Sequence, residues 1–265
     1  VSGVGCYSFV GRDVAEVVDD DGRTASGVNV SLIVPLGDGH NDTRETNWEW
    51  LRARWEALRP GWEIIEGRCR ADRWCKADAV ADAARWATGD VWVICDADLW
   101  VESWPTLKEA AELATQHPWV VPCGNVYRLN APATADIVAR DPDRPVEWPT
   151  ARSSLDMGTR NNNPYRLFPG GGIFALTPEA YDLAGGFDPR FVGWGGEDTS
   201  LGAALDTLAG PHHRLEASVW HLRHPKSKQA DKIGRPTGVN ERLNRRYLAA
   251  SGDREAMQRL IDREV

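Results

Sequence analysis

The stretch that decides the fold is Val91-Trp92-Val93-Ile94-Cys95-Asp96-Ala97-Asp98. Its apolar first part is rich in Val and Ile and follows the turn signal Gly89-Asp90, which predicts a buried strand over residues 91–95. Asp96 and Asp98 come directly after it, at the carboxyl end of the strand, where open α/β sheets bind their ligands. Two carboxylates at this spacing can hold one divalent cation, and that cation can carry a phosphate. The motif alone is also compatible with a solvated turn, because Asp is common in turns.

Two strand-and-helix units precede this stretch. Residues 28–36 (VNVSLIVPL) predict a buried strand, and residues 62–65 predict a second strand that ends at Glu66. Helices are expected over about residues 42–58 and 72–87. The apolar face of the first would hold Trp48, Leu51, Trp55 and Leu58, and that of the second would hold Trp74, Ala77, Ala81 and Ala84. Alternating strands and helices with short connections predict a parallel sheet with right-handed crossovers.

The second half of the chain is less regular. A helix over residues 103–116 and a strand over 119–122 are followed by the Pro-rich segment 124–170, which predicts either an acceptor-side loop or a structural excursion. A strand over 173–176 leads into Thr177-Pro178, which is typical of a helix start. A further helix to about residue 208 and a strand over 215–222 follow. Residues 1–27 predict a small β appendage, residues 225–238 a mobile basic segment, and Asn240 the cap of a C-terminal helix.

Composition limits the classes of function. The 265 residues suffice for one α/β domain, and the net charge of −8 gives no general affinity for nucleic acid or anionic membranes. No apolar run approaches the ~20 residues of a membrane span. The five cysteines are odd in number and irregularly spaced. They predict reduced thiols in a cytoplasmic protein and argue against a zinc site.

Four features in order carry a resemblance to a known family. They are the strand that ends at Pro35, the Asp-x-Asp after the third strand, the run GGGIFALTPEAYDLAGGFDPRF from residue 170, and WGGED at residues 194–198 followed by a strand end with histidines. Together they resemble the GT-A nucleotide-sugar glycosyltransferases. Residues 28–101 resemble the bacterial family 2 transferases. Residues 170–224 resemble the β-1,4-galactosyltransferase and polypeptide N-acetylgalactosaminyltransferase group.

The resemblance implies a metal site. Asp98 would be a direct ligand of Mn²⁺ or Mg²⁺, and Asp96 would contact the metal or the donor ribose. His224 would be the distal ligand, because a His completes the metal site at this strand end in the galactosyltransferase group. His221 is either a second imidazole ligand or a buried strand histidine.

The resemblance also implies a donor site, with a UDP-sugar as the donor by analogy. Arg73 and Lys76 would reach the diphosphate, unless they form a solvated helix face. Glu66 would contact the base, and Pro35 and Leu36 would border the nucleoside. Gly171 and Gly172 would let the backbone approach the sugar. Trp194 would close over the donor, or it is an ordinary aromatic residue in a tight turn.

The expected fold is a single α/β GT-A domain with a mostly parallel, helix-flanked sheet. Residues 28–123 would form its nucleotide-sugar-binding half and residues 124–224 its acceptor and catalytic half, followed by a mobile loop and helix over residues 225–265. Within WGGED, Asp198 would be the general base of an inverting transfer and Glu197 would bind a sugar hydroxyl, whereas the simpler interpretation is that Asp198 caps the helix.

The acceptor stays open between a glycan, a protein side chain, a lipid-linked sugar and a hydroxylated nucleobase. The composition favours a bacterial or phage genome, and no stable nucleic-acid partner is expected. Two other functions stay open. A nucleotidyltransferase would carry Lys or Arg after the first strand, where this chain has Gly37-Asp38-Gly39-His40. A non-catalytic sugar-binding module would be expected to lose Asp98 or Asp198.

Overall fold

The computed structural model describes residues 27–37, 42–58, 61–101, 104–155, 172–225 and 238–262. The predicted N-terminal appendage therefore lies outside the described residues except for Gly27. The predicted mobile segment 225–238 also lies outside them, apart from its two end residues. None of the helices in the described ranges combines the length and apolarity that crossing a membrane demands.

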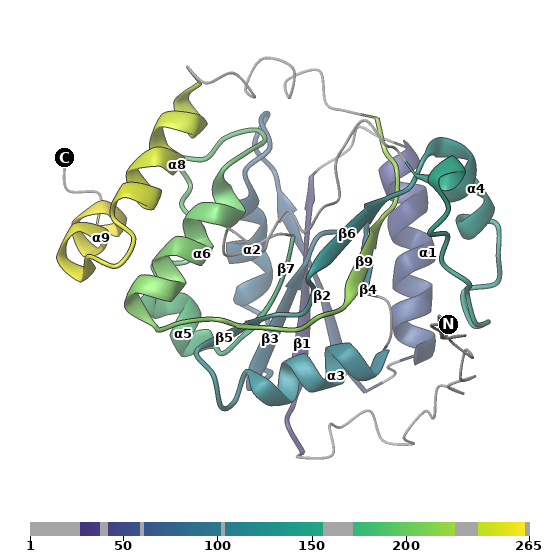
Figure 1. The fold of residues 1–265 in the computed structure, drawn as a ribbon, viewed down its shortest axis with the longest axis horizontal. Coiled ribbons are helices and arrows are strands. Elements are labelled where there is room, and N and C mark those ends of the chain that lie inside the picture. The colour runs from purple at the N-terminus through teal and green to yellow at the C-terminus, as the bar shows by residue number, and fades with distance from the viewer. Residues whose placement is uncertain are drawn as a thin grey trace, which may run out of the picture.

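A six-stranded mixed sheet forms the centre of the molecule, in the order β2-β1-β3-β7-β5-β8 (Figure 1). Its strands are β1 (Val30–Gly37), β2 (Glu63–Cys69), β3 (Val91–Cys95), β5 (Trp119–Val121), β7 (Ile173–Leu176) and β8 (His213–Arg214). The first seven residues from Val30 to Leu36 carry the apolar run predicted from the sequence, and all but the last are buried. The predicted strand over 62–65 is longer than expected and continues past Glu66 to Cys69.

The parallel pairing predicted from the alternating pattern is confirmed for β2-β1-β3 and is also present between β5 and β8. β7 runs antiparallel to both of its neighbours, β3 and β5. This direction matters for the site, because an antiparallel neighbour begins where β3 ends. The register pairs Cys95 with Ile173, so the residues before β7 lie beside the Asp-x-Asp turn.

Helices cover the sheet. α1 (Asp42–Leu58) and α2 (Lys76–Ala84) follow the first two strands, α3 (Trp104–Leu113) lies below the sheet in Figure 1, and α5 (Pro178–Leu183) and α6 (Glu197–Leu208) follow β7. The face predicted for α1 is confirmed, since Trp48, Leu51, Trp55 and Leu58 are all buried.

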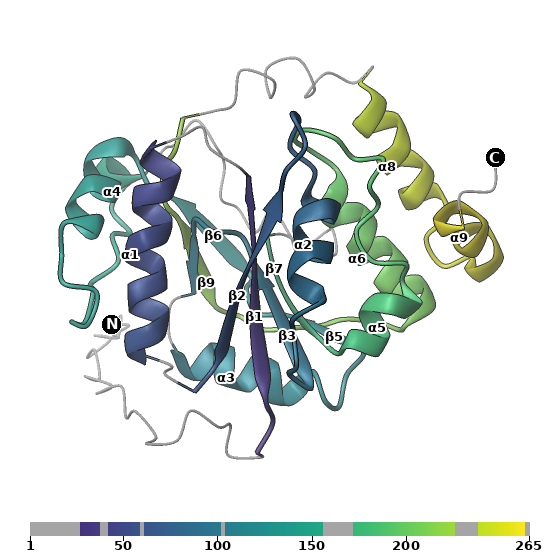
Figure 2. The same cartoon turned by 180° about the vertical axis from the view of Figure 1, so that it is seen from behind.

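The face predicted for α2 is confirmed only in part, since Ala77 is buried and Ala84 is half-buried. Trp74 precedes the helix and Ala81 is exposed, whereas Lys76, Ala79, Val80 and Ala83 are buried. α2 packs against β1 and β2 (Figure 2). α2 approaches β2 so closely that a Cβ at Gly67 would lie 1.8 Å from the carbonyl oxygen of Ala79.

The segment predicted to be irregular over residues 124–170 contains regular structure. Its described part holds β6 (Asn125–Arg128), α4 (Ala131–Val138) and a short 3₁₀ turn at Arg152–Ser154. β6 joins a second, three-stranded sheet with β4 (Leu99–Val101) and β9 (Ser218–His221), in the order β4-β9-β6. β4 and β6 are too short to show an alternating hydrophobic pattern, so the sequence did not predict them.

Two helices end the described chain, where the sequence predicted one. They are α8 (Val239–Ala249) and α9 (Arg254–Ile261), on the same side of the molecule as α5 and α6 (Figure 1). Asn240 does not cap α8, because the cap position is Gly238. The Asn240 side chain is instead buried and donates to the carbonyl oxygen of Val192, 3.2 Å away.

Candidate active site and metal centre

The Asp-x-Asp turn lies between the two sheets. The Leu99 N–H donates to the carbonyl oxygen of Asp96, 3.1 Å away, and this tight turn connects β3 to β4. β4 pairs antiparallel with β9, with Leu99 opposite His221. The Leu222 N–H then donates to the carbonyl oxygen of Asp98, 2.8 Å away. Strand pairing therefore places the histidines of the β9 end beside Asp98.

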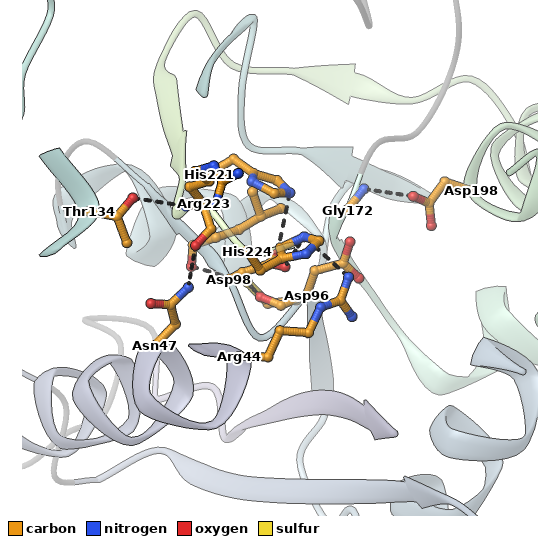
Figure 3. A network of polar contacts seen from close by, with 12 residues as sticks. Arg44, Asn47, Asp96, Asp98, Thr134, Gly172, Asp198, His221, Arg223 and His224 are labelled. Atoms are coloured by element: carbon orange, nitrogen blue, oxygen red, sulfur yellow. Dashed lines mark hydrogen bonds and ion pairs between the residues drawn. The ribbon is translucent and has the colours of Figure 1, made fainter. Parts of the chain in front are cut away.

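Asp98, His221 and His224 converge on one point (Figure 3). The Nε2 of His224 lies 3.1 Å from one carboxylate oxygen of Asp98, and the Nε2 of His221 lies 3.6 Å from the other. One ligand atom from each residue falls within 4.8 Å of the others. Ligands about 2.0–2.2 Å from one ion are separated from each other by roughly 3 Å or more. The spacing therefore fits a shared metal ion.

The backbone between the two histidines is held from two helices. The buried side chain of Asn47 on α1 donates to the carbonyl oxygen of Arg223, 3.2 Å away. The Arg223 N–H donates to the hydroxyl of Thr134 on α4, 2.9 Å away (Figure 3). These two hydrogen bonds fix the backbone between His221 and His224, and with it the direction in which both rings point. Supporting groups orient the ligands of metal sites in the same way.

The hydrogen bonds of His224 fix its tautomer. Its Nδ1 lies 2.9 Å from the carbonyl oxygen of Pro225, which can only accept, so Nδ1 carries a proton and Nε2 is the accepting nitrogen whenever the ring is neutral. The Nε2 lone pair then faces the Asp98 carboxylate, and two acceptors this close need a cation between or beside them. The Arg44 guanidinium, 3.1 Å from the same Nε2, supplies one. The donor set of two imidazoles and a carboxylate fits Mn²⁺, and it would also accept Zn²⁺.

The electrostatics of this cluster favour a negative Asp98. Burial of Asp98 disfavours its charge, but the neighbouring His221 and His224 outweigh that cost and hold the pKa of Asp98 well below its usual range. Burial lowers the pKa of His221, and the Asp98 charge opposes that shift. An ionised carboxylate beside a neutral imidazole is the protonation state in which both can bind a metal.

The start of β7 closes the other side of the Asp-x-Asp turn. The Asp96 N–H donates to the carbonyl oxygen of Gly172 at 2.7 Å, and the Gly172 N–H donates to Asp198 at 3.1 Å. Gly172 has a φ of +66°, and a Cβ there would lie 2.5 Å from Leu99 and 3.1 Å from Asp96. Only glycine fits this approach without strain.

Lys76 connects the two acidic motifs. It is the first residue of α2, is 3% exposed, and places its Nζ 2.6 Å from Asp96 and 2.7 Å from Asp198. Although burial disfavours its charge, Asp198 and Asp96 raise the pKa of Lys76 and keep it protonated. The lysine that the resemblance assigns to the diphosphate is thus located in the site, with two carboxylates as its partners.

The WGGED loop leads into α6. Gly193, Gly195 and Gly196 all have positive φ, so the backbone on both sides of Trp194 is one that only glycine adopts readily. Trp194 is 55% exposed. Glu197 accepts a hydrogen bond from the Gly195 N–H, and burial, reinforced by the Asp198 charge, raises the pKa of Glu197 to about 7.

The remaining residues assigned to the donor lie on β1 and β2 or just before α2. Pro35 is buried and Leu36 half-buried near the carboxyl end of β1, and Arg73 is exposed before α2. Glu66 accepts from Trp48, Arg52 and Arg68, which together outweigh burial and lower its pKa. Gly171 lies outside the described residues. The roles assigned to these residues stay predictions.

Four residues that shape the site were not expected from the sequence. Arg44, Asn47, Thr134 and Asn240 reach the histidines or the WGGED loop through hydrogen bonds from helices. Asn47 offered one signal, because it is a polar residue directly beside Trp48 on the apolar face of α1. Arg44, on an exposed helix surface, offered none.

A family match supports the resemblance. Residues 157–227 match the family described as the N-terminal domain of galactosyltransferase. This range contains Gly172, the WGGED loop and both candidate histidine ligands. No curated protein matches the chain.

One solved structure supports the fold, and a second is reported beside it. The chain is similar to a mutant of Drosophila β-1,4-galactosyltransferase 7, solved in complex with manganese, UDP-Gal and xylobiose. The match covers 82% of this chain and 79% of the Drosophila chain, with 12% identity and a TM-score of 0.50. A mannosyltransferase from Pyrobaculum calidifontis, in complex with GDP-Man and Mn²⁺, is similar over 92% and 72%, with 17% identity and a TM-score of 0.49. The chain is therefore a GT-A-fold protein that resembles galactosyltransferases.

Proposed function

We propose that this protein is a metal-dependent glycosyltransferase that moves a sugar from a nucleotide-sugar to a hydroxyl acceptor with inversion at the anomeric carbon. One observation carries the proposal. A carboxylate and two imidazoles converge within 4.8 Å at the carboxyl end of β3, and a second acidic pair, Glu197 and Asp198, lies on the other side of the same turn. Metal binding and proton removal would thus occur in one site.

The metal would be Mn²⁺, held by Asp98, His221 and His224, with Mg²⁺ as the alternative. Bound there, it would neutralise the negative charge that develops on a nucleoside diphosphate leaving group. A UDP-sugar is the proposed donor. The support comes from the structural neighbour solved with manganese and UDP-Gal.

Asp198 would take the proton of the acceptor hydroxyl as the new bond to the anomeric carbon forms. The bond to the diphosphate breaks at the same centre, and the leaving group keeps the electron pair. Asp198 lies in the first turn of α6, where the helix dipole favours its ionised form. Its two oxygens each accept one hydrogen bond and each retain a further lone pair for the incoming proton. Glu197 would bind a hydroxyl of the sugar.

The proposed acceptor is a carbohydrate hydroxyl, because the same neighbour was solved with xylobiose. We also propose a reducing, cytoplasmic location. Cys69, Cys75, Cys95 and Cys123 are unpaired and buried, which is the usual state of thiols in that compartment.

The test is Mn²⁺-dependent hydrolysis of a panel of UDP-sugars without any acceptor, followed by transfer to oligosaccharides. Asp198→Asn is nearly isosteric, so transfer should fall by roughly 10²–10⁴-fold while Mn²⁺ and UDP binding persist. Asp182→Asn, an exposed carboxylate on α5, is the matched control and should transfer normally. Release of pyrophosphate from UTP in the presence of a sugar 1-phosphate would indicate a nucleotidyltransferase. Donor binding without turnover would indicate a sugar-binding module, and a retained anomeric configuration would refute inversion.

A further inference from the structure

Lys76 occupies a position that the resemblance does not explain. Its ammonium group lies between two carboxylates from distant parts of the chain, Asp96 after β3 and Asp198 in α6. It also lies over the ring of Phe187, 5.0 Å from the ring centroid. A lysine that serves a diphosphate would need its ammonium directed at open space, and this side chain is 3% exposed.

We propose that Lys76 is a positioning residue, which fixes the Asp198 carboxylate for proton removal and ties it to the donor side of the site, and that it is not a ligand of the diphosphate. The inference rests on the proposed function, because it assigns a role within that reaction. It departs from the sequence-based assignment of Lys76 to the donor phosphates.

The first argument is the closed circuit of contacts. Lys76 bridges Asp96 and Asp198. Asp198 accepts from the Gly172 N–H, and the Gly172 carbonyl accepts from the Asp96 N–H. Every member of the circuit is therefore held from two sides, and only the lysine is in direct contact with both carboxylates. Moving it to a phosphate would break two ion pairs and leave two acidic groups facing each other.

The second argument is the rigidity of the lysine's own support. Lys76 begins α2, and α2 packs against β2 at Gly67 with no space for a side chain. The residue before it, Cys75, contacts the carbonyl oxygen of Pro189 in the loop that precedes WGGED. Because the start of α2 is held in this way, Lys76 is better suited to orienting a neighbouring side chain than to moving onto a phosphate.

The third argument is charge balance. Three carboxyl groups gather here, on Asp96, Asp198 and Glu197, and each of them stabilises the positive charge of Lys76. An uncharged residue at this position would leave the three without their shared cation. Asp198 would then lose the cation that orients its carboxylate.

The experiment compares Lys76→Met, Lys76→Arg, Asp198→Asn and the double variant Lys76→Met/Asp198→Asn. We expect Lys76→Met to lower kcat by roughly 10²-fold or more, while the Kd for UDP in the presence of Mn²⁺ stays within threefold of wild type. Lys76→Arg should recover part of kcat, because it keeps the charge. The double variant should be little worse than Asp198→Asn, since residues that act as a unit are not additive. Lys108→Met on α3 is the control and should change neither quantity.

Three results would overturn the inference. They are a UDP Kd weakened tenfold or more with kcat preserved, additive losses in the double variant, and normal kcat in Lys76→Met. If thermal unfolding shows that Lys76→Met does not fold, Lys76→Arg carries the test through the same split between kcat and the UDP Kd. Absence of turnover in the wild-type protein with every donor is a different outcome, which refutes the proposed function itself.

Discussion

Arg44 and His224, 180 residues apart in the chain, share a contact of 3.1 Å at the Nε2 atom of the histidine. This nitrogen is the one that faces Asp98 and that a metal would bind, because Nδ1 is committed to the carbonyl oxygen of Pro225. The guanidinium on α1 therefore occupies the lone pair that the metal centre needs. It also places a positive charge near the point where a divalent ion would sit.

Replacing Arg44 should strengthen metal binding in the absence of nucleotide. Arg44→Met removes both the competitor for the Nε2 lone pair and a repelling charge. We expect the Kd for Mn²⁺ to fall about three- to tenfold, which corresponds to roughly 0.7–1.4 kcal/mol. Titration followed by electron paramagnetic resonance of free Mn²⁺ measures this. An unchanged or weaker affinity would show that Arg44 supports the metal site instead of competing with it.

His221 and His224 should both contribute to Mn²⁺ affinity, and a histidine outside the site should not. His224→Ala and His221→Ala each remove an imidazole from the converging set, so Mn²⁺ affinity should drop by about 10–100-fold in each. His117→Ala is the control, because His117 stacks on His213 of β8, the edge strand of the six-stranded sheet. Wild-type Mn²⁺ affinity in either site variant would remove that residue from the ligand set.

Several elements of the fold were predictable because their signals are local. The apolar run before Asp96 predicted β3, and Thr177-Pro178 predicted the start of α5, where the Thr177 side chain accepts from the Ala180 N–H. Each signal needs only a few neighbouring residues. The resemblance assigned Asp98 and His224 to one site, and the structure places their side chains 3.1 Å apart.

The partners of these residues were not predictable, because they depend on pairing between distant segments. The antiparallel direction of β7 brings Gly172 to Asp96, and no local pattern specifies it. Lys76 could not be separated from a solvated helix residue, since its burial follows from how α2 packs on the sheet. The role of Asn240 was wrong for the same reason: its side chain is used by a loop that lies far away in the sequence.

Gly172 should tolerate no side chain. Gly172→Ala would combine a φ of +66° with contacts of 2.5 Å to Leu99 and 3.1 Å to Asp96. We expect a loss of about 1–3 kcal/mol in the free energy of unfolding, and a loss of transfer activity larger than that of stability. Gly252→Ala is the matched control, because Gly252 also has a positive φ, +81°, but a Cβ there meets nothing within 4 Å. Equal losses of activity in the two variants would contradict a close approach at the site.

Asp188 should make the stability of the protein sensitive to acid. Burial opposes its charge, but hydrogen bonds from Arg190 and Tyr247 outweigh burial and lower its pKa. A carboxyl group whose pKa is lower in the folded state stabilises fully above its unfolded pKa, about 3.9, and loses that contribution as the pH falls below it. Asp188→Asn should therefore lower the free energy of unfolding at pH 7 by about 3 kcal/mol.

The same variant should also flatten the decline of stability below about pH 4. Urea unfolding between pH 3 and pH 7 measures both effects. Asp143→Asn, at an exposed position, is the control and should follow the wild-type curve. A decline as steep as in wild type would assign the acid sensitivity to other carboxylates.

Asn240 should govern the donor side of the site without touching the metal. From α8 it donates to the carbonyl oxygens of Val192 and Trp194, at 3.2 and 3.5 Å, and so supports the loop that carries the exposed tryptophan. Asn240→Ala leaves these carbonyls without that donor, so the loop should sample more conformations. We expect the donor KM to rise and kcat to fall by about tenfold together, a change of roughly 1.4 kcal/mol in each, because loop supports affect both quantities. Mn²⁺ affinity should not change, since the metal residues are held by α1 and α4 instead.

Arg245→Ala, an exposed position on the same helix, should leave all three quantities as in wild type. A weakened Mn²⁺ affinity in Asn240→Ala, or an unchanged KM, would contradict this role for α8.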